Sequence, residues 1–135
     1  MPEKIEIEAL PVTDRFLRQK RLIQERGELA LIEDGLTIRH LGYFSLKKGT
    51  GYYRGGHSHE KKTERFYIIS GSIRLQYVDL DSARSGDVQL SAGMRVLIHP
   101  RCAHRFQAME DAQVIEYYDS AYDPLDDLPY VFTPE

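Results

Sequence analysis

The sequence predicts an all-β fold, a sandwich or barrel of short strands, and three observations support this prediction. Short apolar segments follow one another closely from residue 28 onward, and clusters rich in Gly and Asp separate them. Apolar and polar residues alternate within the segment SIRLQYVDL, as expected of a strand with one buried face. No helical segments alternate with the strands, which argues against a parallel α/β fold. We therefore expect one antiparallel domain.

The elements can be placed in order along the chain. Residues 13–26 fit a short amphipathic helix with polar N-cap candidates at its start and Gly27 as its stop. Residues 28–34 and 36–46 fit two strands, and Asp34-Gly35 between them is a hairpin turn signal. The further predicted strands are residues 64–70, 72–80, 87–93, 94–100 and 104–120.

The length of 135 residues fits a single domain, which we expect to span residues 1–135. Its core is expected at about residues 36–119, between an N-terminal arm at 1–27 and a C-terminal tail at 120–135. The tail is rich in Pro and Asp, so we expect an extended arm or a cover there rather than a regular element.

The composition excludes several classes of protein. A net charge of -3 and a pI near 6.0 give no broad basic field, so no nucleic-acid partner is expected. The one cysteine, Cys102, cannot form an internal disulfide. The N-terminus has no secretory h-region, and no apolar run is long enough to span a bilayer. A soluble, cytoplasmic protein with no membrane partner is the expectation.

The segment GYYRGGHSHEKKTERFYIISG, residues 51–71, carries the strongest functional signal. His57 and His59 are two residues apart, so in an extended strand both side chains point to one face. The polar run EKKT fits a turn, which allows Glu64 at the start of the next strand to lie across from the pair. His104 follows another apolar strand and is the fourth candidate. Imidazoles with one carboxylate suit Mn, Fe, Co, Ni or Zn, whereas a polar turn is the alternative.

The residues of this segment resemble the first motif of the cupin family, which runs glycine, five residues, His-x-His, three or four residues, Glu, six residues, glycine. Its fixed positions are occupied here by Gly51, His57, His59, Glu64 and Gly71. The resemblance, to small single-domain RmlC-like cupins of type 2, covers roughly residues 36 to 119. It implies a jelly-roll barrel, or double-stranded β-helix, and one divalent metal ion held by the three histidines and the glutamate.

The second cupin motif is matched only in part. Gly93 and His104 fit its register, but His99 stands where proline is usual, Arg101 where glycine is usual and Ala108 where asparagine is usual. A glycine at the position of Arg101 would allow a left-handed turn, which is unfavourable for other residues. The direction in which His104 points therefore depends on this turn.

Other residues are candidates for roles around the site. Tyr53, Phe66 and Phe106 share faces with the predicted ligands and could line a substrate pocket, although most inward aromatic residues belong to a core. Glu64 and His99 are the candidate catalytic residues, with His99 and His40 also fitting structural or surface positions. A thiolate at Cys102 could be reactive, but a buried thiol is the stronger interpretation.

The function implied is isomerisation or epimerisation of a sugar or nucleotide sugar in carbohydrate metabolism. RGGHSHEKKTERFYIISGSI is similar to the RGxHxHK region of nucleotide-sugar ketoisomerases, and EYYDSAYDPLDD is similar to the end of cupin domains in nucleotide-sugar enzymes. An iron-dependent dioxygenase and a non-catalytic cupin that binds a small ligand remain alternatives, so catalysis itself stays open. Small cupins are commonly dimers, which implies a homodimer whose N-terminal arm adds to the partner's sheet edge.

Overall fold

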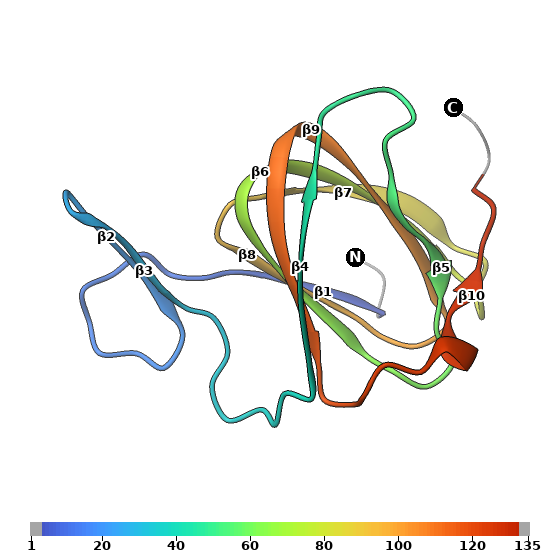
Figure 1. The fold of residues 1–135 in the computed structure, drawn as a ribbon, viewed down its shortest axis with the longest axis horizontal. Helices are drawn as coiled ribbons and strands as arrows, with labels where there is room; N and C mark the ends of the chain where they lie inside the picture. Colours follow the sequence, from blue (N-terminus) through green and yellow to red (C-terminus); the bar gives the residue numbers. More distant parts are fainter. Residues whose placement is uncertain (1–3, 133–135) are drawn as a thin grey trace.

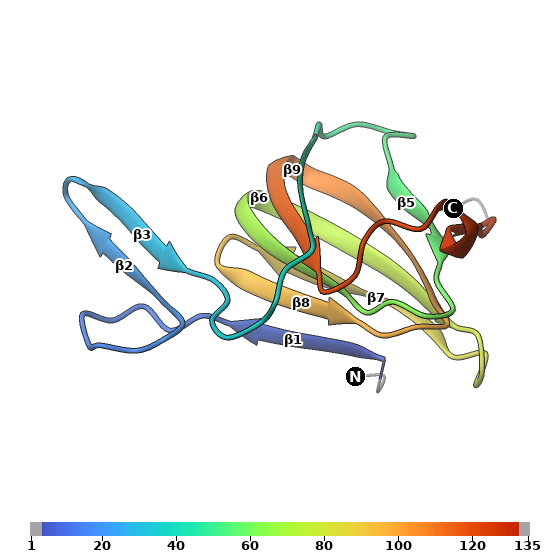
Figure 2. The same cartoon turned by 60° about the horizontal axis from the view of Figure 1, so that its bottom comes forward.

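The computed structural model describes residues 4–132 and shows a barrel of antiparallel strands with a hairpin projecting from it (Figures 1 and 2). The hydrogen-bonded order of the main sheet is β1-β8-β6-β9-β5-β10, with β4 paired to β9 and β7 paired to β6. The all-β prediction is confirmed. The barrel strands are β1 (Ile5–Ala9), β4 (His40–Leu46), β5 (Arg54–Ser58), β6 (Glu64–Asp79), β7 (Ser85–Ser91), β8 (Met94–Ile98), β9 (Cys102–Tyr118) and β10 (Leu128–Pro129).

Two long strands, β6 and β9, organise the barrel. The first part of β6 pairs with β8 and its second part pairs with β7, while β9 follows it along both parts. The register between β6 and β9 shifts between Ile68 and Ile73, where Gly71 has a φ of 86°. Such an irregularity bends a strand and increases its twist. The bend lets one continuous strand line two walls of the barrel.

The core fills the barrel between these strands. Ile73 and Leu75 are fully buried, and Tyr77 packs against the same cluster, as the alternation in this segment predicts. Apolar side chains from β6, β8 and β9 complete the cluster. Among them are Phe66, Ile68, Val96, Ile98, Phe106 and Val114.

The predicted helix at residues 13–26 is wrong. The structure has instead the strands β2 (Lys20–Gln24) and β3 (Gly27–Leu31), which pair as a two-stranded sheet of their own. Gly27, at a φ of 134°, follows a tight turn and does not stop a helix. The short apolar run of β2 does not by itself distinguish a strand from a helical turn, and its pairing with β3 decides the outcome.

Two smaller expectations are also corrected. Gly35 does lie in a turn with a φ of 84°, but the strands on either side do not pair with each other, since β3 pairs with β2 and β4 pairs with β9. The tail is more regular than expected, because it contains the 3-10 helix η1 (Pro124–Asp126) and the short strand β10. The arm and tail residues 1–3 and 133–135 lie outside the described residues. No helix in the described part of the chain could span a membrane.

Candidate metal centre

The four predicted ligands come together inside one end of the barrel. His57 lies in β5, His59 follows that strand, Glu64 begins β6 and His104 lies in β9. The strands β5 and β9 pair with His57 directly opposite His104, and Glu64 approaches from the wall formed by β6 and β8. One ligand atom from each residue lies within 4.8 Å of all the others.

The contacts within the cluster are short but poorly shaped for hydrogen bonds. Glu64 Oε1 lies 2.8 Å from His59 Nε2 and 2.9 Å from His104 Nε2. None of these three buried atoms has a hydrogen-bond partner of acceptable geometry. Buried polar atoms are normally satisfied. Their convergence without alignment is what a shared ion between them would produce, so the donor set fits a divalent transition metal.

The opposite nitrogen of each imidazole has its own partner outside the cluster. His59 Nδ1 lies 2.5 Å from the Asp126 carbonyl oxygen, and His104 Nδ1 lies 2.9 Å from the Cys102 carbonyl oxygen. A carbonyl oxygen only accepts, so both Nδ1 atoms must donate their hydrogen. His57 Nδ1 is 2.8 Å from Asp127 Oδ1. The lone pair of each Nε2 is thereby left free, which is the arrangement found around metal-binding histidines.

The electrostatics of two members of the cluster favour its metal-binding protonation state. Burial disfavours the charged Glu64 carboxylate, but the adjacent His104 and His59 outweigh burial and hold its pKa well below the usual range. Burial and the charge of His104 lower the pKa of His57 to about 4, although Glu64 and Asp127 oppose this shift. An ionised carboxylate and a neutral imidazole are the forms that ligate metals.

The pKa of His59 is shifted in the opposite direction, toward the protonated form that does not bind metals. Burial lowers its pKa, but the adjacent negative charge of Glu64 outweighs burial and raises it. A metal ion binds the neutral imidazole, so the affinity of the cluster for a cation is expected to fall in acid.

Comparison with known proteins identifies the family to which this barrel belongs. Residues 42–119, more than half of the chain, match the family described as Cupin domain. This chain is a cupin. The chain matches no curated protein by sequence.

Solved structures of the same jelly-roll fold include three sugar-nucleotide enzymes. A TDP-quinovose 3,4-ketoisomerase from Campylobacter jejuni has a TM-score of 0.73 at 16% identity, covering 95% of this chain and 94% of that one. A 3,4-ketoisomerase mutant from Thermoanaerobacterium thermosaccharolyticum, in complex with TDP, has a TM-score of 0.71 at 17% identity over 95% and 88%. A dTDP-4-dehydrorhamnose 3,5-epimerase from Bacillus anthracis has a TM-score of 0.65 at 18% identity over 82% and 74%. The predicted cupin jelly roll is confirmed.

The structure places two of the other predicted site residues beside the cluster and two of them away from it. The Phe66 and Phe106 rings are buried beside His104, at centroid distances of 6.2 and 6.1 Å, and form an apolar wall. Tyr53 is not brought to the cluster, because its ring lies 3.9 Å from the guanidinium of Arg105, which follows His104 in β9 and faces the other side. His99 is also remote and pairs with Glu6 on the outside at 2.6 Å.

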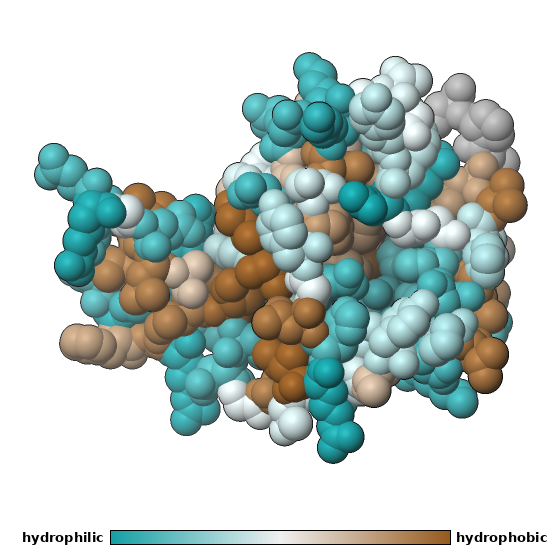
Figure 3. Space-filling view, viewed as in Figure 1, coloured by the Kyte–Doolittle hydropathy of each residue, from teal (hydrophilic) through white to brown (hydrophobic). Residues whose placement is uncertain are grey.

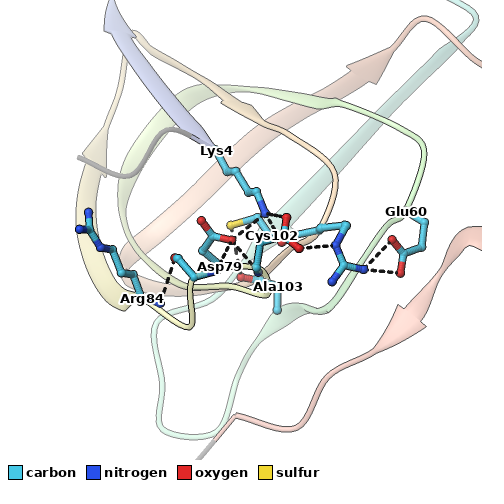
Figure 4. Close-up of polar contacts among 9 residues, drawn as sticks. Lys4, Glu60, Asp79, Arg84, Cys102 and Ala103 are labelled. Carbon is cyan, nitrogen blue, oxygen red and sulfur yellow. Dashed lines mark hydrogen bonds and ion pairs between the residues drawn. The ribbon is translucent and has the colours of Figure 1, made fainter.

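The turn before β9, which has Arg101 in place of the usual glycine, still directs His104 into the cluster. Arg101 does adopt the left-handed conformation, with a φ of 61°, and its backbone N–H donates to the His59 carbonyl oxygen at 2.7 Å. Its guanidinium pairs with both Glu60 and Asp81, at 2.9 and 2.7 Å. Lys4 pairs with both Asp79 and Asp81, so a chain of ionic contacts connects Lys4 through Asp81 and Arg101 to Glu60 (Figure 4). These contacts offset the backbone strain that the sequence implies at Arg101.

Cys102 is a buried structural thiol rather than a reactive one. Its side chain belongs to the core, and burial together with the negative charge of Asp79 raises its pKa to about 11. The thiolate form that would attack an electrophile or a metal is therefore disfavoured.

Sequence reasoning missed an acidic residue that faces the barrel interior, Glu116. It alternates on β9 with the buried Val114 and Tyr118, and it pairs across the sheet with Phe66. Within residues 4–132 its carboxylate has neither a hydrogen bond nor an ion pair. Burial, followed by the charge of Glu64, raises the pKa of Glu116. The signal was a charged residue at an inward position of the strand AQVIEYY.

Proposed function

We propose that this cupin binds one divalent transition metal through His57, His59, Glu64 and His104, and that it isomerises or epimerises a sugar or nucleotide sugar. The observation that carries the metal is the convergence of the buried Nε2 atoms of His59 and His104 on Glu64 Oε1 without hydrogen-bond alignment. The oxygen acceptors beside the Nδ1 atoms of all three histidines support it.

The sugar substrate is supported by the kind of protein that shares the fold. The structures described above are ketoisomerases and an epimerase of TDP sugars, and one form of the T. thermosaccharolyticum enzyme is in complex with TDP-4-keto-6-deoxyglucose. Such likeness alone carries no activity across, since one fold hosts many functions. Two features of this chain itself support the proposal. They are an acidic group inside the barrel, Glu116, and the apolar wall of Phe66 and Phe106 beside the candidate ligands.

These features can be given roles in the reaction. A bound metal would polarise a carbonyl or hydroxyl oxygen of the sugar. Isomerisation also needs a base that removes a proton from the carbon next to a carbonyl, and a return of that proton to a neighbouring position. Glu116 is the group in this barrel that suits this task, because its carboxylate has no hydrogen bond or ion pair within residues 4–132 and burial raises its pKa. Phe66 and Phe106 would exclude water from the reacting carbon.

The metal is tested by elemental analysis of protein purified without chelator. We expect close to one Mn, Fe, Co, Ni or Zn per chain, and His57→Ala and Glu64→Ala should each lose most of it. His99→Ala is the matched control, because this histidine is outside the barrel and should leave the metal content unchanged. Wild-type protein that is metal-free and cannot be loaded with any of the five metals would refute the proposal.

The reaction is tested with TDP-4-keto-6-deoxyglucose under anaerobic conditions in D₂O. Sugar isomerisation predicts incorporation of deuterium at the carbon that exchanges its proton, and Glu116→Gln should slow this at least 100-fold with the metal content unchanged. Oxygen consumption by the metal-loaded protein would indicate the dioxygenase alternative. Tight binding of TDP sugars without any exchange would indicate a ligand-binding cupin.

The homodimer is part of the same proposal, and the projecting hairpin supports it. An isolated two-stranded hairpin is marginally stable in water. This one nevertheless exposes Ile23, Leu29 and Leu31, and an apolar groove lined by Ile38 and Leu41 lies between it and the barrel. Figure 3 shows hydrophobic residues continuing from the hairpin across its junction with the barrel. We infer that a second copy covers this surface.

Light scattering at micromolar concentration tests this assignment. The wild type should have twice the mass of the chain, and Leu29→Asp should be a monomer, because a buried unpaired charge would oppose the interface. Val131→Asp is the control, since Val131 is also an exposed apolar residue, more exposed than Leu29, but lies in the tail. A wild type that is monomeric at 100 μM would contradict the homodimer.

A further inference from the structure

The C-terminal segment lies directly against His57 and His59, although it is more than 60 residues away from these two histidines in sequence. The strand β10 pairs with β5, so that Leu128 lies opposite Ser58 and Pro129 lies opposite His57. The Tyr130 N–H continues this pairing by donating to the Gly56 carbonyl oxygen at 2.8 Å. Figure 2 shows the tail returning to the end of the barrel beside β5. The tail thus completes the sheet edge that carries two of the histidines.

Two consecutive residues of this segment contact one histidine each. Asp127 Oδ1 is 2.8 Å from His57 Nδ1, and the Asp126 carbonyl oxygen is 2.5 Å from His59 Nδ1. Both contacts fall on the nitrogen that faces away from the cluster. The acceptor differs in charge, since His57 meets a carboxylate and His59 meets a neutral carbonyl. A carboxylate partner also increases the electron-donating strength of an imidazole.

The side chain of Asp126 holds the loop that follows His59. Its carboxylate accepts the backbone N–H groups of Glu60 and Lys61, at 2.7 and 3.1 Å. Burial opposes ionisation of this side chain, which is only 6% exposed, but the backbone donors of the loop outweigh burial and lower its pKa. One residue therefore fixes both the ring of His59 and the backbone beside it.

We propose that the C-terminal segment 126–130 is a working part of the metal centre, in which Asp126 and Asp127 are positioning residues for His59 and His57. They hold each ring in the tautomer whose Nε2 can bind a cation. The part of this inference that concerns metal affinity rests on the proposed function, whereas the part that concerns the histidine tautomers does not. Metal binding to the cluster and docking of the tail on β5 are thermodynamically linked. A metal ion should therefore stabilise the docked tail, and loss of docking should lower the affinity for the metal by the same factor.

The experiment compares the full-length wild type with Asp127→Ala, Asp127→Asn and Asp126→Ala. Asp123→Ala is the matched control, because Asp123 caps η1 through the Leu125 N–H and touches neither histidine. Titration with Co²⁺ alone gives the affinity, with the visible spectrum reporting the ligand geometry. We expect a 10–100-fold loss for the two alanine variants at 126 and 127, a smaller loss for Asp127→Asn and less than threefold for Asp123→Ala.

Nitrogen-15 NMR of the metal-free protein provides a readout that a purely structural role would not move. In the wild type, the His57 and His59 rings should carry hydrogen on Nδ1 in their neutral form. The Asp127→Ala variant should lose this preference at His57 only. Hydrogen exchange at the Tyr130 amide should slow when Co²⁺ is added to the wild type and should respond less in Asp127→Ala.

The outcomes separate the two proposals. If the wild type does not bind Co²⁺ but has Nδ1–H tautomers, the proposed metal site is refuted and the positioning role of the two aspartates stands. Co²⁺ affinities within threefold of wild type in folded Asp127→Ala, or Nε2–H tautomers in the wild type, overturn the positioning role. If Asp126→Ala does not fold, Asp127→Ala still decides, because the Asp127 side chain is 35% exposed and its removal leaves no buried cavity.

Discussion

The barrel and the projecting hairpin are built from the same kind of strand and differ in what their side chains touch. In the barrel, the inward residues of β6 and β9 are buried against one another, and Leu75 and Val114 are fully inaccessible to solvent. In the hairpin, the apolar Ile23 and Leu29 are 53% and 50% exposed. Figure 1 shows the hairpin extending away from the barrel.

This difference shows where the stability and the chemistry of the chain reside. Burial of apolar area is the main favourable term in folding, so the barrel can hold buried charged and polar groups in fixed positions at its open end. The hairpin buries little within its own chain and carries one notable ion pair, from Arg21 to Glu28 at 2.9 Å. Such a region is expected to open at low free energy unless a partner covers it.

The largest expected effect tests this contrast with the same substitution in both regions. Leu75→Ala removes a fully buried side chain and should lower the free energy of unfolding by about 2–5 kcal/mol. Leu29→Ala removes a half-exposed one and should cost less than about 1 kcal/mol in the monomer. Urea unfolding at low protein concentration measures both. Equal losses would mean that the hairpin is packed as tightly as the barrel.

A second prediction concerns the glycines of the first cupin motif, both of which have a positive φ. A Cβ at Gly71 would lie 2.2 Å from the Asp111 carbonyl oxygen, at a φ of 86°. Gly71→Ala should therefore cost about 2–4 kcal/mol, from strain and overlap together. Gly51 has a φ of 82° but open space around it, so Gly51→Ala should cost only about 1 kcal/mol. Thermal unfolding compares the two, and similar shifts would contradict the close approach at the β6 bend.

The sequence could predict the convergence of the four candidate ligands, because strand geometry constrains where their side chains point. Residues 57 and 59 had to face one side, and the polar turn after them returned the chain toward Glu64. Glu116 was open to the same reasoning, since it occupies an inward position of β9, but its neighbours YY and VI obscured the alternation.

The tail and the hairpin could not be predicted in the same way. Asp126 meets His59 across 67 residues, and nothing local in a Pro- and Asp-rich segment indicates which strand it will join. The apolar residues between 13 and 26 fitted a helical stripe approximately, and only the pairing of β2 with β3 decided for strands. In both regions long-range contacts override local propensity.

A third prediction uses the metal to distinguish the barrel from the hairpin. Adding Co²⁺ at 100 times its dissociation constant should stabilise the native state by about 2.7 kcal/mol, through binding that the unfolded chain lacks. Hydrogen exchange should slow at β5 and at the start of β6, and should not change in β2 and β3. EDTA should reverse the effect. Uniform protection that includes the hairpin would mean that the two regions unfold as one unit.

The smallest effect concerns a barrel turn that, like the hairpin, relies on exposed charges. Arg101 and Ala83 both have left-handed backbones, at φ values of 61° and 64°. Ala83→Gly should relieve strain and raise the melting temperature by up to about 3 °C, since Ala83 contributes no charged side chain. Arg101→Gly relieves similar strain but removes the contacts to Glu60 and Asp81.

These opposing terms should leave the melting temperature of Arg101→Gly within about 3 °C of wild type. The difference between the two glycine variants then isolates the ionic contacts of Arg101, and it should shrink in 1 M salt because exposed pairs are screened. A loss well beyond this range that persists in high salt would instead show that the Arg101 side chain packs as part of the barrel.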